Sequence, residues 1–222
     1  MKSYIEKIVS IDKVTHDVLK IVLNKPANYS FTPGQATEVS INKEGWKDEK
    51  RPFTFTCLPD DSLLEFTIKT YPDHSGVTNE LRSLQPGDEL IIRDVWGAIT
   101  YKGEGLFIAG GAGVTPFIAI FRHLQQQKKI GNNKLIFGNK TKADIIYRQE
   151  FRNMLGDNFI NILSDEKKEG YAHGMIDRKF LEKHKEASLK KFYVCGPPPM
   201  MKAIEGILSE MGVASDAVVV EL

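Results

Sequence analysis

The chain has 222 residues, of which 41% are hydrophobic and 27% are charged, and its formal net charge is +1. This composition is ordinary for a globular protein, and the balanced charge argues against nucleic acid or an anionic membrane as a partner. The two cysteines, Cys57 and Cys195, lack metal-binding spacing, so we expect no resident metal and no iron–sulfur cluster. No run approaches about 18 apolar residues, and no signal-like segment opens the chain, which together predict a cytoplasmic protein.

The first hundred residues consist of short β-rich runs separated by turn signals such as Pro33-Gly34 and Pro86-Gly87. We expect six strands, at residues 5–11, 18–23, 37–41, 53–58, 64–69 and 90–93. Six strands at this spacing predict an antiparallel sandwich or a closed barrel. The run 75–84 interrupts the pattern and predicts a short helix with Ser75 as its N-cap.

After residue 102, short buried-strand runs alternate with helical patterns. The strands are expected at 106–109, 134–137, 159–163, 191–195 and 217–220, and the helices at 116–128, 144–155, 177–184 and 198–211. This alternation predicts a parallel sheet with helices on both faces. We therefore divide the chain into two domains, 1–101 and 102–222.

Two turns rich in glycine and proline follow strands of the predicted parallel sheet. The first reads GGAGVTP at 110–116, and the second reads CGPPPM at 195–200. Parallel sheets bind ligands at the carboxyl ends of their strands, and helix starts attract phosphate. A dinucleotide here would place its phosphates on the first turn and its nicotinamide beside Cys195, in an open turn above the sheet. Taken alone, the first segment fits a tight strand-to-helix turn equally well, and Cys195 equally fits a buried small hydrophobic residue.

In the first half, the predicted strand that begins at Arg51 carries a cation, an aromatic ring and a hydroxyl group in succession. Arg51 could neutralise a phosphate, while Phe53 offers a flat face and Thr54 a hydrogen-bond donor. Taken alone, an ordinary strand with a solvated arginine is the simpler interpretation. Gly76 opens the predicted short helix, whose first amides form a second potential phosphate site.

Together these segments resemble the ferredoxin–NADP reductase superfamily, and the resemblance covers essentially the whole chain. The matching segments are 31–35 (FTPGQ), 51–54 (RPFT), 68–71 (IKTY), 76–78 (GVT), 110–116, 195–200 and the terminal Glu221. The resemblance implies a six-stranded antiparallel Greek-key β-barrel that binds FAD. A Rossmann-like domain with a five-stranded parallel sheet would follow it and bind NADH or NADPH, with hydride transfer between the two cofactors.

The resemblance also implies roles for individual residues. Thr54 is placed near flavin N5 and Cys195 beside the nicotinamide ring with Glu221 nearby, and these three form the expected catalytic set. Arg51 is expected to contact the FAD pyrophosphate, and Phe53 to pack along the flavin. The other expected cofactor-binding residues are Pro52, Ile68, Lys69, Tyr71, Gly76, Val77 and Thr78 for FAD, and Gly111, Gly113, Val114, Thr115, Pro116, Asn139, Asp165, Gly196, Pro197 and Met200 for the nicotinamide cofactor.

The choice between NADH and NADPH depends on the residues that meet the adenosine ribose. Where NADPH-dependent members of the superfamily often carry a Ser-Arg pair, this chain reads Ser164-Asp165. An anionic Asp165 would repel a 2′-phosphate and could accept a hydrogen bond from a ribose hydroxyl, which favours NADH. Lys140 and Lys142 could bind that phosphate instead, so NADPH stays open.

Three departures from the superfamily affect the expected function. Phe53 stands where a tyrosine is common, the chain ends at Leu222 without a flavin-covering aromatic residue, and it has no cysteine cluster for a two-iron ferredoxin domain. We therefore expect electrons to leave for a separate acceptor, which would be a ferredoxin, a flavodoxin or an oxygenase component. Two alternatives remain: a flavin reductase that uses flavin as a loosely held substrate, and a non-catalytic electron-relay subunit of a larger complex.

Overall fold

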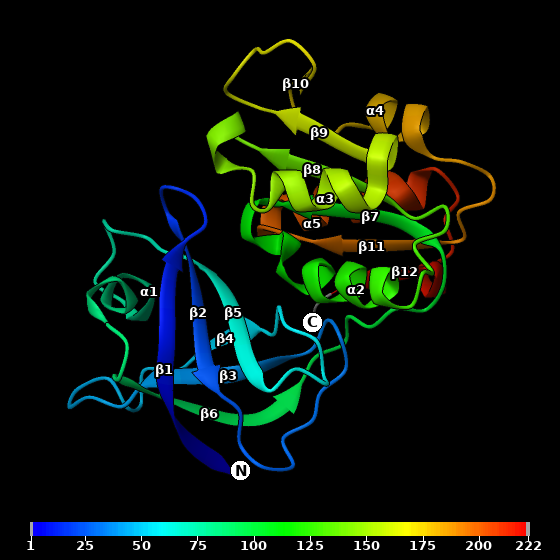
Figure 1. Ribbon diagram of the computed structural model, residues 1–222. Coiled ribbons are helices and arrows are strands. Elements are labelled where there is room, and N and C mark those ends of the chain that lie inside the picture. The colour runs from blue at the N-terminus through cyan, green and yellow to red at the C-terminus, as the bar shows by residue number, and fades with distance from the viewer. Residues whose placement is uncertain (1, 221–222) are drawn as a thin grey trace.

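The computed structural model describes residues 2–220, which form two six-stranded sheets, each with its own helices (Figure 1). The first sheet is antiparallel, and its strands lie in the order β4-β3-β6-β1-β2-β5. Its strands are β1 (Ser3–Lys13), β2 (Val18–Asn24), β3 (Ala36–Ile41), β4 (Arg51–Thr54), β5 (Leu63–Lys69) and β6 (Glu89–Trp96). The predicted six-stranded antiparallel barrel is confirmed, and a tightly packed group of aromatic rings fills it, with Phe31 stacked 4.2 Å from Phe55.

The two outer strands of this sheet, β4 and β5, approach each other because the chain changes its hydrogen-bonding partner after β4. β4 begins two residues earlier and ends four residues earlier than the strand expected at 53–58. Beyond β4, Phe55 forms an isolated bridge with Phe66 of β5, and the amide of Thr56 donates to the carbonyl of Glu65 at 2.8 Å. The chain therefore leaves β3 and turns onto β5, which nearly closes the barrel. Hydrophobic alternation cannot reveal this switch because it continues through both pairings.

The predicted short helix is present but is smaller than expected. α1 (Val77–Glu80) has one turn and continues into a 3₁₀ turn, Leu81–Ser83. Its N-cap is Gly76, not Ser75, and no side chain caps the first turn. The helix is held by burial of Val77 and Leu81 in the barrel core.

The second sheet is parallel, with its strands in the order β10-β9-β8-β7-β11-β12. Its strands are β7 (Gly105–Gly110), β8 (Lys134–Asn139), β9 (Phe159–Leu163), β10 (Ala172–His173), β11 (Lys191–Cys195) and β12 (Val218–Val220). Five of these strands were predicted. The sixth, β10, has only two residues, too few to produce a detectable pattern.

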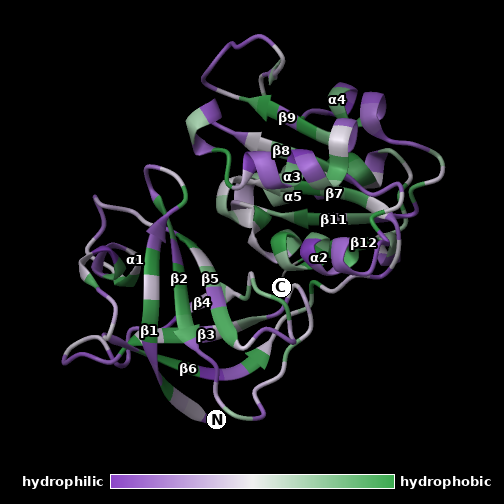
Figure 2. Cartoon of the chain, viewed as in Figure 1, coloured by the Kyte–Doolittle hydropathy of each residue, from purple (hydrophilic) through white to green (hydrophobic). Residues whose placement is uncertain are grey.

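Four helices cover the two faces of this sheet: α2 (Thr115–Gln126), α3 (Arg148–Leu155), α4 (Arg178–His184) and α5 (Pro198–Glu210). Alternate residues of β7 point to opposite faces, as the pleat requires. Phe107 packs in the cluster formed with α2 and α3, whereas Leu106 packs in the cluster formed with α4 and α5. Figure 2 shows the hydrophobic colour concentrated on the central strands, whereas the surrounding helices carry both hydrophobic and hydrophilic colour. The predicted layering is therefore confirmed.

The third predicted helix begins later than expected. Asp144 ends a 3₁₀ turn, Lys142–Asp144, and α3 starts only at Arg148. Between them Ile145 and Ile146 are buried in the core, and Tyr147 adopts a left-handed backbone conformation with φ of 48°. Burial of the two isoleucines holds this segment out of a continuous helix.

The barrel and the parallel-sheet domain share apolar packing where the chain passes from one to the other. Val18 of β2 and Ile99, which precedes β7, belong to the same buried cluster as α2. A Cβ added at Gly34 would lie 3.1 Å from the carbonyl carbon of Ile99 and 3.2 Å from Cδ1 of Ile120, so only glycine fits at this crossing. None of the helices within residues 2–220 has the length and apolar character that crossing a membrane requires.

Candidate functional site

The two glycine- and proline-rich turns lie side by side at the carboxyl edge of the parallel sheet. β7 and β11 are paired, with Ala109 opposite Cys195. A Cβ added at Gly113 would lie 2.5 Å from the amide nitrogen of Gly196, a distance that no side chain tolerates. A Cβ at Gly110 would collide with the sulfur of Met200. The absence of side chains at these glycines therefore allows the backbones of the two turns to touch.

The first turn presents backbone amides at the start of a helix. Residues Gly111–Val114 form a 3₁₀ turn, and α2 follows with Pro116 in its first turn, as predicted. Gly111 has φ of +52° and open space where a Cβ would lie. The hydroxyl of Thr115 donates to the carbonyl of Ala112 at 3.0 Å and stabilises the turn. The side chains of Val114 and Pro116 are buried, which leaves the backbone of the turn as the surface that a ligand can reach.

Cys195 lies at the end of β11, but it does not lie in the open turn that its sequence context suggested. Its relative exposure is 5%, and it belongs to the buried cluster that also contains Ala109 and Val114. Cys195 lies on the same face of β11 as Tyr193, which belongs to the same cluster, so the structure favours the buried small hydrophobic residue that the sequence left open. The expected contact residues that follow, Gly196, Pro197 and Met200, lie at the junction of the two turns.

Asn139 ends β8 at the same edge of the sheet. Its side chain is 8% exposed, and neither its amide nitrogen nor its amide oxygen has a hydrogen-bond partner within residues 2–220. Its backbone carbonyl accepts from the amide of Ser164 at 3.0 Å, which ties the ends of β8 and β9 together. An unpartnered buried amide destabilises a fold by about 1–3 kcal/mol, so this group is available for a partner that the chain itself does not supply.

The loop after β9 places acidic groups near this edge. The hydroxyl of Ser164 donates to Asp165 at 2.5 Å, and the amide of Asp165 donates to the carbonyl of Lys140. The backbone amide of Lys142 donates to Glu166 at 2.7 Å, and this bond, followed by that from Lys168, lowers the pKa of the Glu166 carboxyl. The loop therefore places the carboxylates of Asp165 and Glu166 beside Lys140 and Lys142, the two lysines that could bind a 2′-phosphate.

The predicted flavin strand presents a cation and a ring on one side of β4. Arg51 and Pro52 are exposed, and Arg51 lies 3.6 Å from Glu49. The half-buried Phe53 has its ring 6.5 Å from the ring of Phe66, while Thr54 is nearly buried and pairs with Ala36.

Other residues expected around a flavin are divided between surface and core. Lys69 is held by an ion pair with Asp17 at 2.8 Å, and Tyr71 is exposed with its ring 5.7 Å from that of His74. The side chains of Ile68 and Val77 are buried in the barrel core, whereas Gly76 and Thr78 reach the surface at the start of α1. Glu221 lies outside the described residues.

Sequence reasoning missed a set of polar residues between the barrel and the parallel sheet. Arg122 on α2 contacts Glu65 of β5 and Glu150 of α3, and Tyr147 contacts Thr67 of β5. Each of these residues reads as an ordinary solvent-facing position, because only the packing of the two domains brings them together. Close to this set, the thiol of Cys57 is buried, and burial raises its pKa to about 11. The thiol therefore stays protonated at neutral pH.

Residues 3–90 match the family described as FAD-binding domain, and residues 107–206 match the family described as oxidoreductase NAD-binding domain. The chain belongs to the ferredoxin reductase-like superfamily. It therefore carries an FAD-binding domain followed by a NAD-binding domain, and the expected cofactor classes are confirmed.

Among curated proteins, this ferredoxin reductase-like chain is 28% identical to the reductase component of propane 2-monooxygenase from Mycolicibacterium goodii, over 96% of this chain and 65% of the relative. It is 29% identical to NADH-cytochrome b5 reductase 2 from Mycosarcoma maydis, over 88% of this chain and 62% of the relative. The chain thus spans less than two thirds of the length of these relatives.

Among solved structures, a ferredoxin NADP⁺ reductase from Neisseria gonorrhoeae with bound FAD and NADP superimposes with a TM-score of 0.88 at 18% identity. The match covers 100% of this chain and 98% of that one. At this level of identity the likeness establishes the shared two-domain fold.

Proposed function

We propose that the protein is an FAD-containing NAD(P)H oxidoreductase that favours NADH and passes electrons to a separate acceptor. The observation that carries this proposal is the order and packing of an FAD-binding domain and a NAD-binding domain in one chain. The two domains share a buried apolar cluster, to which the barrel side contributes Val18 and Ile99. We place the domain limits at 1–101 and 102–222.

The edge of the parallel sheet fits a dinucleotide. Gly111 leaves the amides of the turn open, Gly113 lets the neighbouring turn approach, and α2 has twelve residues whose aligned dipoles favour a phosphate at its start. The unpartnered amide of Asn139 offers both a donor and an acceptor at the same edge. We assign Thr115 to the phosphates and Cys195 to packing beneath the nicotinamide, as a spacer and not as a nucleophile.

On the barrel, we assign Arg51 to the FAD pyrophosphate, Phe53 to the face of the flavin and Thr54 to a hydrogen bond with flavin N5. The side chain of Arg51 is about half exposed, so a phosphate can reach it although it pairs with Glu49 and donates to the carbonyl of Lys50. Hydride transfer, two electrons with one proton, is the chemistry that the bound nicotinamide and flavin supply. The residues of the chain bind and orient them, so no strong acid or base is needed.

Asp165 favours NADH over NADPH in this proposal. Its carboxylate lies at the carboxyl edge of β9, and the loop that follows carries Glu166 as a second anion. A 2′-phosphate placed there would meet negative charge, whereas a ribose hydroxyl would find an acceptor.

For the acceptor, we propose a small redox protein, such as a ferredoxin or flavodoxin, or an oxygenase component. The support comes from relatives whose names include the reductase component of propane 2-monooxygenase and the ferredoxin–NAD(P)⁺ reductase component of a naphthalene 1,2-dioxygenase system. No cysteine cluster for an iron–sulfur centre is present in the sequence, so the next carrier must be a separate domain or molecule.

An absorption spectrum of the purified protein tests the proposal. We expect a yellow protein whose flavin bands bleach on anaerobic addition of NADH, and more slowly with NADPH. A colourless protein that oxidises NADH only when free flavin is added would identify a flavin reductase instead. A yellow protein that neither nucleotide bleaches would identify an electron-relay subunit.

A further inference from the structure

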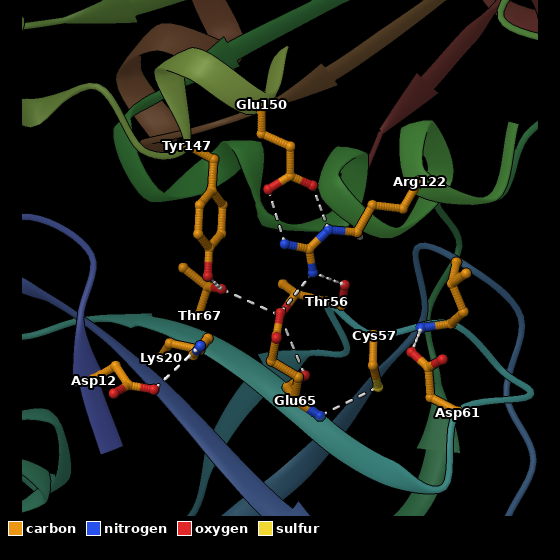
Figure 3. A network of polar contacts seen from close by, with 11 residues as sticks. Asp12, Lys20, Thr56, Cys57, Asp61, Glu65, Thr67, Arg122, Tyr147 and Glu150 are labelled. Carbon is orange, nitrogen blue, oxygen red and sulfur yellow. Dashed lines mark hydrogen bonds and ion pairs between the residues drawn. The ribbon is translucent and has the colours of Figure 1, made fainter. Parts of the chain in front are cut away.

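A partly buried group of charged and hydroxyl side chains around Arg122 joins the barrel to the parallel-sheet domain (Figure 3). Toward the barrel, Nη1 of Arg122 donates to the carbonyl of Thr56 and to Oε1 of Glu65, both at 2.6 Å. Toward its own domain, Nε and Nη2 donate to the two carboxylate oxygens of Glu150, at 2.6 and 3.0 Å. We call this group the Arg122 bridge; its members are Arg122, Thr56, Glu65, Thr67, Tyr147 and Glu150.

The bridge is hydrogen-bonded on every side. The side chains of Arg122 and Glu65 are 20% and 19% exposed. The hydroxyl of Thr56 donates to Glu65 at 2.8 Å and lies 3.1 Å from the hydroxyl of Thr67, which in turn lies 3.2 Å from that of Tyr147. Burial lowers the pKa of Arg122, but the bonds and charges of Glu150 and Glu65 outweigh it and raise the pKa above its usual value. The guanidinium therefore stays cationic.

Such an arrangement fixes geometry more than it adds stability. A buried ion pair gains little net free energy, because desolvation of the charges offsets their attraction. A planar guanidinium that binds one carboxylate through two bonds, however, allows a narrow range of orientations. Arg122 binds Glu150 in this way and donates its other hydrogen bonds to Thr56 and Glu65 on the barrel.

Both ends of the bridge are continuous with segments assigned to the cofactors. α2 begins directly after the Gly111–Val114 turn, and Arg122 lies seven residues beyond Thr115, about 10 Å along a rigid helix. On the barrel side, Thr56 lies two residues beyond Thr54, the residue assigned to flavin N5. The hydrogen bond from Arg122 to Thr56 therefore links the helix that follows the dinucleotide turn to the segment that directly follows β4, the strand assigned to the flavin.

Tyr147 is held in an uncommon backbone conformation at the same place. Its φ of 48° lies in the left-handed region, which disfavours a residue with a Cβ. Its ring centre lies 5.1 Å from Cζ of Arg122, and its hydroxyl reaches Thr67 on the barrel. Tyr147 therefore contacts both Arg122 in its own domain and Thr67 on the barrel.

We propose that Arg122 is a positioning residue for hydride transfer: through its bonds to Thr56 and Glu65 it sets the orientation in which the two cofactor-binding domains meet. This inference rests on the proposed function. Transfer depends steeply on alignment, and a misplacement of about 1 Å lowers a rate by on the order of 100-fold. Losing the bridge should therefore reduce the rate of transfer while each domain still binds its own cofactor.

Stopped-flow measurement of flavin bleaching by NADH tests this. We expect Arg122→Met to lower the limiting rate roughly tenfold or more, with a smaller change in the NADH concentration that gives half of it and an unchanged FAD content. Arg122→Lys keeps the positive charge but lacks the planar guanidinium that binds a carboxylate through two bonds, so it should recover only part of the rate. The matched control is Arg152→Met, which removes an exposed ion pair to Asp157 within one domain and should leave the rate unchanged.

A second measurement does not depend on turnover. Hydrogen exchange of the FAD-loaded protein without nucleotide should be faster in Arg122→Met at the facing segments, β5 and α2, than in Arg152→Met. If Arg122→Met does not fold, the same two measurements are made on Glu65→Gln. This change removes one charge on the barrel side and leaves the Arg122–Glu150 pair intact.

The outcomes separate the two proposals. A folded, yellow Arg122→Met protein with an unchanged limiting rate would overturn the positioning role, even if its melting temperature fell. An unmodified protein that no nicotinamide nucleotide reduces would overturn the proposed function itself, and the inference with it.

Discussion

Asn139 and Arg122 lie in the same domain, and their hydrogen bonding is opposite. The amide of Asn139 is buried at the sheet edge with no partner within residues 2–220, whereas Arg122 at the domain interface donates four hydrogen bonds to two carboxylates and a carbonyl. The sheet edge is built from glycine and backbone, whereas the interface combines apolar packing with long charged side chains. The difference indicates that the edge is left incomplete for a ligand, whereas the interface is complete without one.

The largest expected effect comes from adding a side chain at Gly113, where the two turns touch at the sheet edge. Gly113→Ala would place a Cβ 2.5 Å from the amide nitrogen of Gly196, and backbone at that distance must move. We expect flavin reduction by NADH to fall on the order of 100-fold and the free energy of unfolding to fall by about 1–3 kcal/mol, with FAD retained. Stopped-flow absorbance and urea unfolding measure the two.

The matched control for that change is Gly206→Ala. Gly206 lies within α5 and has nothing within 4 Å of the new Cβ, so the change should leave the rate unaltered and stabilise the helix by roughly 0.5–1 kcal/mol. Equal effects of the two alanines would contradict the role given to the contact between the turns.

The charge of the β9 loop offers a sharper test of what the edge binds. Asp165→Arg should raise the ratio of NADPH to NADH efficiency about tenfold, because a cation replaces the anion proposed to face the ribose. Steady-state kinetics with each nucleotide measure the ratio. Glu169→Arg, the same change of charge four residues on, should leave it nearly constant; a shift of equal size would show a general field effect.

A buried cysteine at the edge should matter less than the glycine. Cys195→Ser keeps the size of the side chain but adds a more polar group to a 5% exposed position. We expect flavin reduction by NADH to slow several-fold, within a factor of ten, with FAD still bound. An unchanged reduction rate would remove Cys195 from the nicotinamide contact.

The smallest predicted effect concerns an ion pair within the barrel. Burial raises the pKa of Asp17, but the hydrogen bond and charge of Lys69 outweigh burial and leave it below its ordinary value. A lowered carboxyl pKa adds stability above the unfolded pKa near 3.8, and this stability is lost as pH falls through the folded value. Asp17→Asn should therefore destabilise by less than about 1 kcal/mol at pH 7, and the difference should shrink by pH 3 in urea unfolding.

Much of this architecture could be predicted because short patterns determine it locally. The buried runs at 106–109 and 191–195 have the length of parallel strands, and glycine with proline after each one identifies the ligand edge. The sequence left open whether Cys195 is buried or exposed, since its burial depends on packing in one cluster with Ala109 and Val114, more than eighty residues earlier in the chain. The Arg122 bridge could not be predicted from the sequence either, because its members are separated by up to 94 residues, from Thr56 to Glu150.

The crossing between the halves has a consequence for recombination. Within residues 2–220 the chain passes once from the barrel to the parallel sheet, and there Gly34 packs against Ile99, just before the junction, and against Ile120 of the second half. A chimaera that joins this barrel to the second half of a distant relative would have to match the shape of that contact as well as the junction. Exchange of whole halves is therefore constrained by a glycine more than sixty residues before the splice.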